Sequence, residues 1–440
     1  MFAEQDYLDD LFAFISRSPT ACHAAASGAA LIAAHGFTRL SETDHWGELA
    51  AGSYYLLRDD ASLIAWTLTG PAAAGRPLRL AGAHTDSPAL KVKPNPVQLR
   101  HGCVQLGVEV YGGALLNPWF DRDLSLAGRV VWQQAGGPLA AGLIDFRRPV
   151  ACIPSLAIHL DREVNDKRAI DRQTALVPLF MQADGDAPDF RAILGEQLAA
   201  EHPDTAGAEI LDFDLFLYDP QPPARIGLRG EFISGPRLDN LVSCHALLRA
   251  LVQTAERRDS LVVLNDHEEV GSLSAAGAQG TFLQDLLTRL YPDPVLRRQV
   301  LAASLMVSVD NAHAVHPNFA ARHDPEHLPL VNGGPVIKMN AGQRYATSGP
   351  TAALFRGFCR AAGVPCQQFV MRNDLACGST IGPLTAAALG VAAVDVGIPQ
   401  LAMHSIRETA GSRDGWSLLR ALAAFLSAPD EGIRCPAARP

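Results

Sequence analysis

Residues that can bind metal ions or move protons follow several short apolar segments of this chain. They are His84 and Asp86 after residues 77–83, Asp266, His267, Glu268 and Glu269 after 260–264, Asp310 after 305–309, and His404 after 391–403. A further acid, Asp239, stands where a loop leads into a helical pattern. If the apolar segments are parallel strands, their carboxyl ends lie along one edge of a sheet, where ligand sites commonly form. We therefore expect these side chains to share one site.

The residue types in this set suit a pair of metal ions. Two histidines with three carboxylates and no cysteine can bind zinc, cobalt or manganese. Five ligands exceed the needs of one tetrahedral zinc, but they suit two ions about 3.5–4 Å apart that share a bridging carboxylate and a bridging water. Such a pair produces hydroxide near neutral pH, and a carboxylate that is not a ligand is then needed as general base.

The neighbouring Glu268 and Glu269 can supply both a ligand and a base. Adjacent side chains on an extended segment project to opposite sides, so the two glutamates reach different positions. His84 and Asp86 project to the same side, where the carboxylate can support a histidine ligand. A single Asp at a strand end is usually a turn former or a helix cap. The occurrence of all these residues at strand ends nevertheless favours a metal site.

Other classes of function lack their sequence signals. The net charge is -9 and only 19% of residues are charged, which leaves no basic stripe for nucleic acid. The chain has no G-x-S-x-G, P-loop or G-x-G-x-x-G motif. In the histidine-rich segment at 311–327, we interpret His323 and His327 as solvated residues rather than a second metal site.

The distribution of apolar residues and cysteines predicts a soluble cytoplasmic protein. No segment approaches the roughly 18 uncharged apolar residues of a membrane helix, and the first residues are acidic rather than basic. The eight cysteines are scattered without a C-x-x-C pair. We therefore expect reduced thiols, with neither a disulfide framework nor a zinc finger.

Hydrophobic periodicity predicts an α/β fold with a mixed, mainly parallel sheet flanked by helices. Helical patterns occupy 3–18 and 20–36, and strand-like segments follow as far as residue 84. After residue 232, strands at 260–266, 304–310, 366–371 and 391–397 alternate with helices, which is typical of a sheet covered on both faces. The section 95–232 is strand-like and turn-rich, and we expect a separate β-rich module there.

The polar segments resemble those of the aspartyl aminopeptidase family of dinuclear zinc exopeptidases over nearly the whole chain. Eight segments carry this resemblance, in the order AGAHTDSPALKVKP, IPSLAIHLDREVN, SGPRLDNLVSCHALL, NDHEEVGSLSAAGAQG, SVDNAHAVHPNF, GPVIKMNAGQRYAT, CGSTIGP and MHSIRETAG. The resemblance implies a metalloaminopeptidase that removes the N-terminal residue from short peptides with two zinc ions per subunit, for which cobalt or manganese can substitute.

The resemblance also implies a role for each candidate residue. Asp239 would bridge the two ions and Glu268 would be the general base. The remaining metal ligands would be His84 and Asp310 on one ion and Glu269 and His404 on the other, with substrate contacts from His313, Lys338 and Tyr345.

The same resemblance implies that the oligomer is part of the catalyst. The catalytic domain would comprise 1–94 and 233–440, and 95–232 would be an inserted dimerisation domain. His159 of this domain would reach the active site of a neighbouring subunit. We expect dimers of this kind to assemble into a tetrahedral dodecamer.

The preferred substrate stays open between acidic and neutral N-terminal residues. The chain has Leu375 and Ala376 where we expect a Met-Pro pair in the family. A flexible Lys338 could hold an acidic side chain or the scissile carbonyl. A carboxypeptidase or deacylase with the same metal centre is an alternative, in which Arg344 or Arg407 would clamp a substrate carboxylate. A scaffold that has lost catalysis is disfavoured, because all five ligands and the base are present.

Overall fold

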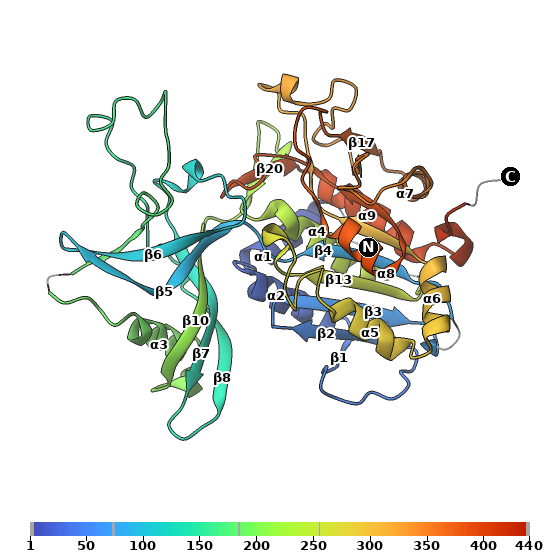
Figure 1. The fold of residues 1–440 in the computed structure, drawn as a ribbon, viewed down its shortest axis with the longest axis horizontal. Coiled ribbons are helices and arrows are strands. Elements are labelled where there is room, and N and C mark those ends of the chain that lie inside the picture. Colours follow the sequence, from blue (N-terminus) through green and yellow to red (C-terminus); the bar gives the residue numbers. More distant parts are fainter. Residues whose placement is uncertain (1–3, 73–74, 184, 255, 437–440) are drawn as a thin grey trace.

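The structure is a computed structural model, which describes residues 4–72, 75–183, 185–254 and 256–436. Within these ranges the strands form three sheets, of nine, six and five strands. Figure 1 shows the six-stranded sheet at one side of the molecule and the nine-stranded sheet with its helices at the other. The predicted α/β class is confirmed.

The nine-stranded sheet is mixed, and four neighbouring strands near its centre are parallel to one another. In spatial order its strands are β1 (Thr38–Arg39), β2 (Gly52–Arg58), β3 (Ser62–Leu68), β13 (Ser260–Asn265), β4 (Arg79–His84), β14 (Leu305–Val309), β18 (Ala392–Gly397), β16 (Val336–Met339) and β17 (Gln367–Val370). The strands β13, β4, β14 and β18 pair in parallel. Every residue of β4, β13 and β14 is buried, which explains their continuous apolar character.

Helices cover both faces of this sheet. The larger core lies beneath α1 (Glu4–Ser16), α2 (Ala21–Ala33), α4 (Leu238–Gln253), α7 (Gly349–Ala362) and α9 (Asp414–Ser427). The opposite face is covered by α5 (Phe282–Leu290), α6 (Pro294–Ala303) and α8 (Ile381–Leu389). With both faces covered, polar side chains gather at the strand ends.

Cap residues set several helix boundaries. The Thr20 side chain accepts a hydrogen bond from the backbone N–H of His23 at the start of α2. Ser348 and Thr351 form a capping box at the start of α7. Gly390 ends α8 in the left-handed conformation, at φ 69°, which a glycine adopts without steric cost.

The six-stranded sheet is antiparallel and has its own core. Its strands are β8 (Leu139–Asp145), β7 (Ser125–Gln133), β10 (Glu209–Tyr218), β5 (Ala89–Arg100), β6 (Cys103–Tyr111) and β9 (Leu179–Gln182), in spatial order. The helix α3 (Phe190–Glu201) packs on it through Phe190, Leu194 and Leu198. Ile406, from the C-terminal part of the chain, also belongs to this core.

The third sheet joins the two larger units. Its strands are β11 (Ala224–Ile226), β12 (Phe232–Gly235), β20 (Glu408–Gly411), β19 (Pro399–Leu401) and β15 (Ala312–His313). The strands of the six-stranded sheet run from Ala89 to Tyr218, whereas the expected separate module covers 95–232. Its use for dimerisation stays a prediction.

The secondary structure follows most of the expected pattern. The expected helices and strands after residue 232 occur as α4, β13, α5, β14, α7, β17, α8, β18 and α9. The elements that the periodicity did not indicate include the helices α3 and α6 and, after residue 231, the strands β12, β15, β16, β19 and β20. Among the described residues, no helix is long and apolar enough to cross a membrane.

Gly397 at the end of β18 leaves no room for a larger residue. A Cβ atom there would lie 1.9 Å from the backbone oxygen of Asp310. We expect Gly397→Ala to lower the free energy of unfolding by about 1–3 kcal/mol, measured by denaturant unfolding, because the strands must move apart. Gly357→Ala is the control, since nothing lies within 4 Å of that Cβ position in α7. This control should raise stability by about 0.5–1 kcal/mol, and equal effects of the two changes would contradict the prediction.

Candidate metal centre

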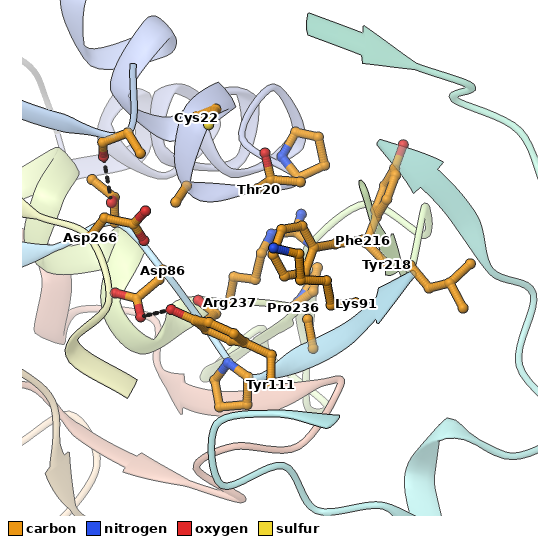
Figure 2. A pocket seen from close by; sticks show the side chains of 18 of the residues that line it. Thr20, Cys22, Asp86, Lys91, Tyr111, Phe216, Tyr218, Pro236, Arg237 and Asp266 are labelled. Atoms are coloured by element: carbon orange, nitrogen blue, oxygen red, sulfur yellow. Dashed lines mark hydrogen bonds between the residues drawn. The ribbon is translucent and has the colours of Figure 1, made fainter. Parts of the chain in front are cut away.

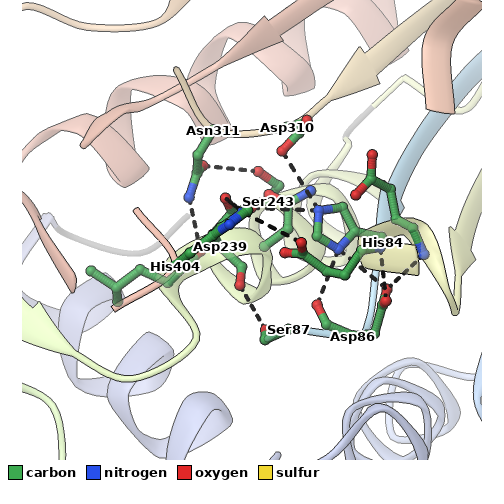
Figure 3. A network of polar contacts seen from close by, with 12 residues as sticks. His84, Asp86, Ser87, Asp239, Ser243, Asp310, Asn311 and His404 are labelled. Atoms are coloured by element: carbon green, nitrogen blue, oxygen red, sulfur yellow. Dashed lines mark hydrogen bonds and ion pairs between the residues drawn. The ribbon is translucent and has the colours of Figure 1, made fainter. Parts of the chain in front are cut away.

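The candidate residues converge at the carboxyl ends of three adjacent strands. His84 is the last residue of β4 and lies opposite Asn265 at the end of β13. Glu268 and Glu269 follow β13 in a short 3-10 turn, and Asp310 follows β14. Asp239 lies in the first turn of α4, and His404 lies between β19 and β20. Figure 3 shows side chains from these separate elements pointing toward one another.

One group of potential ligands consists of His84, Asp239 and Asp310. The His84 Nε2 atom lies 3.4 Å from Asp239 Oδ1 and 3.6 Å from Asp310 Oδ1. One ligand atom from each residue lies within 4.8 Å of the others. The three atoms can therefore surround a single ion.

A second group shares Asp239 with the first. The His404 Nε2 atom lies 3.3 Å from Glu269 Oε2 and 4.0 Å from Asp239 Oδ2. The two oxygens of Asp239 thus face different groups, as a bridging carboxylate requires. His84, Glu268 and Glu269 also come within 4.8 Å of one another, so distance alone does not separate ligand from base.

Two buried oxygens in these groups fit a bound cation. Among the described residues, Asp239 Oδ1 and Glu269 Oε1 have no hydrogen-bond partner. An unpaired buried carboxylate oxygen is costly unless a cation satisfies it. The donor set of imidazole and carboxylate is also the one that zinc accepts.

Each histidine presents its Nε2 atom to the carboxylates because its other ring nitrogen is occupied. His84 Nδ1 lies 3.0 Å from the backbone oxygen of Asp86. His404 Nδ1 lies 3.1 Å from the backbone oxygen of Gly113. A carbonyl can only accept, so Nδ1 carries the hydrogen and Nε2 keeps a lone pair for a metal.

The charges of the site repel one another without a cation. Burial and neighbouring carboxylates raise the pKa of Glu268 to about 8 and the pKa of Glu269 well above its usual range. Burial lowers the pKa of His84, but three carboxylates at 3.4–3.6 Å from its ring nitrogens outweigh it and raise the pKa well above the ordinary value. The two glutamates therefore favour their protonated forms where a metal ion would supply positive charge.

Asp86 orients the turn that carries both glutamates. Its Oδ1 and Oδ2 atoms accept the backbone N–H groups of Glu268 and Glu269, each at 3.1 Å. The hydroxyl of Tyr111 donates to Oδ2 at 2.7 Å. Asp86 is thus placed behind the site, in contact with His84 and the turn together.

The expected substrate contacts lie beside Asp310. Lys338 is 2% exposed, and its Nζ atom lies 3.2 Å from both Asp310 Oδ2 and the backbone oxygen of Asn311. This amine also lies 5.0 Å from the ring centre of Tyr345. Burial and the charge of Lys338 lower the pKa of His313, which favours its neutral form. Lys338 therefore supports Asp310 in addition to any contact with substrate.

The remaining sequence candidates lie in other surroundings. His159 is exposed in the long segment between β8 and β9, which extends away from the sheets in Figure 1. Arg407 donates to Asp219 and to backbone oxygens of the turn that follows β10, whereas Arg344 is exposed. His327 Nδ1 lies 2.7 Å from Asp324, and His323 accepts the backbone N–H of His316.

Glu408 is a polar residue at the site that the sequence patterns did not indicate. It is 1% exposed, and it accepts the backbone N–H groups of Asp239 and His404. The available signal was its place in the segment MHSIRETAG, four residues after His404. The structure shows it behind the ligands, as Asp86 is.

A cavity of about 260 Å³ lies behind these two carboxylates, between the nine-stranded and six-stranded sheets. Its lining includes Asp86, Glu408, Tyr111 and Asp266. Figure 2 shows Tyr111 bonded to Asp86 at its edge. The cavity thus borders the two supporting carboxylates together with one candidate ligand, Asp239.

The chain is similar to metallopeptidases over nearly its full length. Residues 14–426 match the family model described as aminopeptidase I zinc metalloprotease (M18). A probable M18 family aminopeptidase 2 of Stutzerimonas stutzeri is 53% identical over 421 residues, which cover 96% of this chain and 98% of the relative.

Solved structures show the same fold. A chain in the Ape4 and Nbr1 complex has 35% identity and a TM-score of 0.93, with 98% of this chain and 87% of that chain covered. The dodecamer of mApe1 from Saccharomyces cerevisiae has 28% identity and a TM-score of 0.84, with 98% of each chain covered. This chain therefore belongs to the M18 family of zinc metalloproteases and is a metalloaminopeptidase.

Proposed function

We propose that the chain hydrolyses the N-terminal peptide bond of short peptides at a centre for two zinc ions. The observation that carries this proposal is the sharing of Asp239 between two ligand groups. His84, Asp239 and Asp310 would hold one ion, and Asp239, Glu269 and His404 the other. Bound zinc supplies Lewis-acid polarisation of the carbonyl and a hydroxide near neutral pH.

Glu268 acts as general base in this proposal. It lies beside His84 but belongs to neither of the two groups that share Asp239. Burial holds its pKa near 8 without a metal, and added positive charge lowers that pKa, so the carboxylate is ionised when the site is loaded. It takes a proton from the attacking water and delivers it to the amine of the departing peptide.

The N-terminal side chain of the substrate is expected to lie near Lys338, His313 and Tyr345. Lys338 could attract an acidic side chain, but Asp310 neutralises part of its charge at 3.2 Å. Peptides with a neutral first residue are therefore an alternative within the same activity. In a carboxypeptidase or deacylase, the alternative with the same metal centre, Arg407 is engaged by the turn after β10, which leaves exposed Arg344 as the candidate clamp.

A homo-oligomer is part of the proposal. The mApe1 structure similar to this chain is described as a dodecamer. The segment that carries His159 also exposes Leu156 and Leu160, at 59% and 74%, which suits contact with another copy. We propose dimers through residues 95–232, contact of His159 with the neighbouring site, and a tetrahedral dodecamer. A cytoplasmic location is consistent with the free cysteines.

Replacement of Glu268 and replacement of Glu269 should impair the enzyme in different ways. Glu268→Gln should retain zinc and lose about 10²–10⁴-fold in kcat, because the proton acceptor is removed. Glu269→Gln should lose zinc from one site, because a ligand is removed. Zinc content by elemental analysis, together with kcat on an aminoacyl anilide, distinguishes them. Near-normal turnover of Glu268→Gln would exclude it as the base.

Removal of metal should abolish activity and lower the melting temperature. The clustered carboxylates lose the cation that offsets their repulsion, so dialysis against a chelator should destabilise the protein. Zinc, cobalt or manganese should restore both properties, measured by thermal unfolding and anilide hydrolysis. Full activity of protein shown to be free of metal would contradict the proposal.

A substrate panel tests the specificity. Aminoacyl anilides of Asp, Glu, Ala and Leu should all be cleaved at the N-terminal residue. Comparison of their kcat/KM values shows whether the enzyme prefers an acidic or a neutral first side chain. A dipeptide with a blocked amine should not be cleaved, because the free amine is part of recognition. Cleavage of the blocked dipeptide alone would support the carboxypeptidase or deacylase alternative.

A further inference from the structure

Glu408 is a buried carboxylate whose contacts reach both ligand groups. Its Oε2 atom accepts the backbone N–H of Asp239 at 2.9 Å, and its Oε1 atom accepts that of His404 at 2.8 Å. The side-chain nitrogen of Gln400 donates to the same Oε1 at 3.1 Å. Asp239 is common to both groups, whereas His404 belongs to one of them. One side chain therefore fixes the backbone of two ligands from different parts of the chain.

The same network continues to the backbone beside Asp310. The Gln400 side-chain oxygen accepts from Asn311 Nδ2 at 2.7 Å. Asn311 directly follows Asp310, and its Nδ2 atom also donates to the backbone oxygen of Leu238 at 2.9 Å. Figure 3 shows Asn311 close to Asp239. Through these two amides, Glu408 is connected to residues adjacent to two candidate ligands, Asp310 and Asp239.

Asp86 makes the matching arrangement on the other side of the centre. Each carboxylate accepts two backbone N–H groups of site residues, Asp86 from Glu268 and Glu269, and Glu408 from Asp239 and His404. Both are at least 97% buried, so water does not compete for these bonds. A carboxylate that receives backbone N–H groups holds them more firmly than a neutral acceptor does.

We propose that Glu408 is a positioning residue that couples the two zinc sites, by holding the bridging ligand Asp239 and the ligand His404 through their backbones. The inference rests on the proposed dinuclear function and assigns a support that the two ions share. A displacement of Glu408 would move Asp239, and the ligand arrangement around both ions would be disturbed together. Replacement of a residue that contacts only one ligand would instead weaken the binding of one ion.

Replacement of Glu408 by Gln tests this coupling. The amide keeps the size of the side chain but offers a donor where one backbone N–H needs an acceptor. We expect Glu408→Gln to bind both zinc ions about 10–100-fold more weakly, measured by competition with a chromogenic chelator at fixed free zinc. Excess zinc should restore much of the anilide hydrolysis, which it cannot do for Glu268→Gln.

Asp414→Asn is the matched control. Asp414 is also fully buried and accepts two backbone N–H groups, of Asn332 at 2.6 Å and Gly334 at 2.9 Å, at the start of α9. Its exchange should lower the melting temperature while the zinc affinity stays within about twofold of the parent protein. A general loss of stability would therefore be distinguished from a loss of metal positioning.

Three outcomes decide the inference. Unchanged zinc affinity in Glu408→Gln, or weakening at only one site, overturns it. If that variant does not fold, Glu408→Asp keeps both oxygens with a shorter reach, and an affinity equal to the parent protein overturns the inference likewise. Failure of the parent protein to bind two zinc ions would instead refute the proposed function, and the two failures are thus separate.

Discussion

The repulsion between buried carboxylates is the constraint on which the rest of the site depends. Asp86, Asp239, Glu268, Glu269 and Asp310 gather where little water can screen their charges. Burial raises the pKa of both glutamates, and a histidine is driven toward its charged form by its acidic neighbours. Such a cluster is stable only when cations balance it. Lys338 supplies one such charge to Asp310, and metal ions are the natural source of the rest.

The parallel strands make this concentration of charge possible. β13, β4 and β14 are buried along their whole length, and the potential ligands they position lie at the last strand residue or after it. Because the three strands are parallel neighbours, these residues meet at one edge of the sheet. The opposing helix α4 contributes Asp239 from its first turn, which completes both ligand groups.

This regularity explains which parts of the site could be predicted from the sequence. His84, Glu269 and Asp310 follow apolar segments directly, so their convergence could be predicted from strand periodicity and topology. Glu408 could not, because its role depends on backbone N–H groups, one of which belongs to Asp239, far from it in sequence. The helix α6 could not be predicted either. Only Val300 and Leu301 of its residues are buried, so its apolar pattern is weak. The family resemblance was needed to distinguish Glu268 from Glu269, because both lie within reach of His84.

The segment from His404 to Glu408 links the metal centre to the six-stranded sheet. Ile406 packs in the core of that sheet, and Arg407 binds Asp219 at its exit. The loop that follows β6 in turn supplies the backbone oxygen of Gly113 to His404. These five consecutive residues contain a candidate ligand, two contacts to the unit of the six-stranded sheet and the carboxylate of Glu408. A shift of that unit would therefore reach the ligand backbone. If the sheet forms the dimer, assembly and metal geometry are connected through this segment.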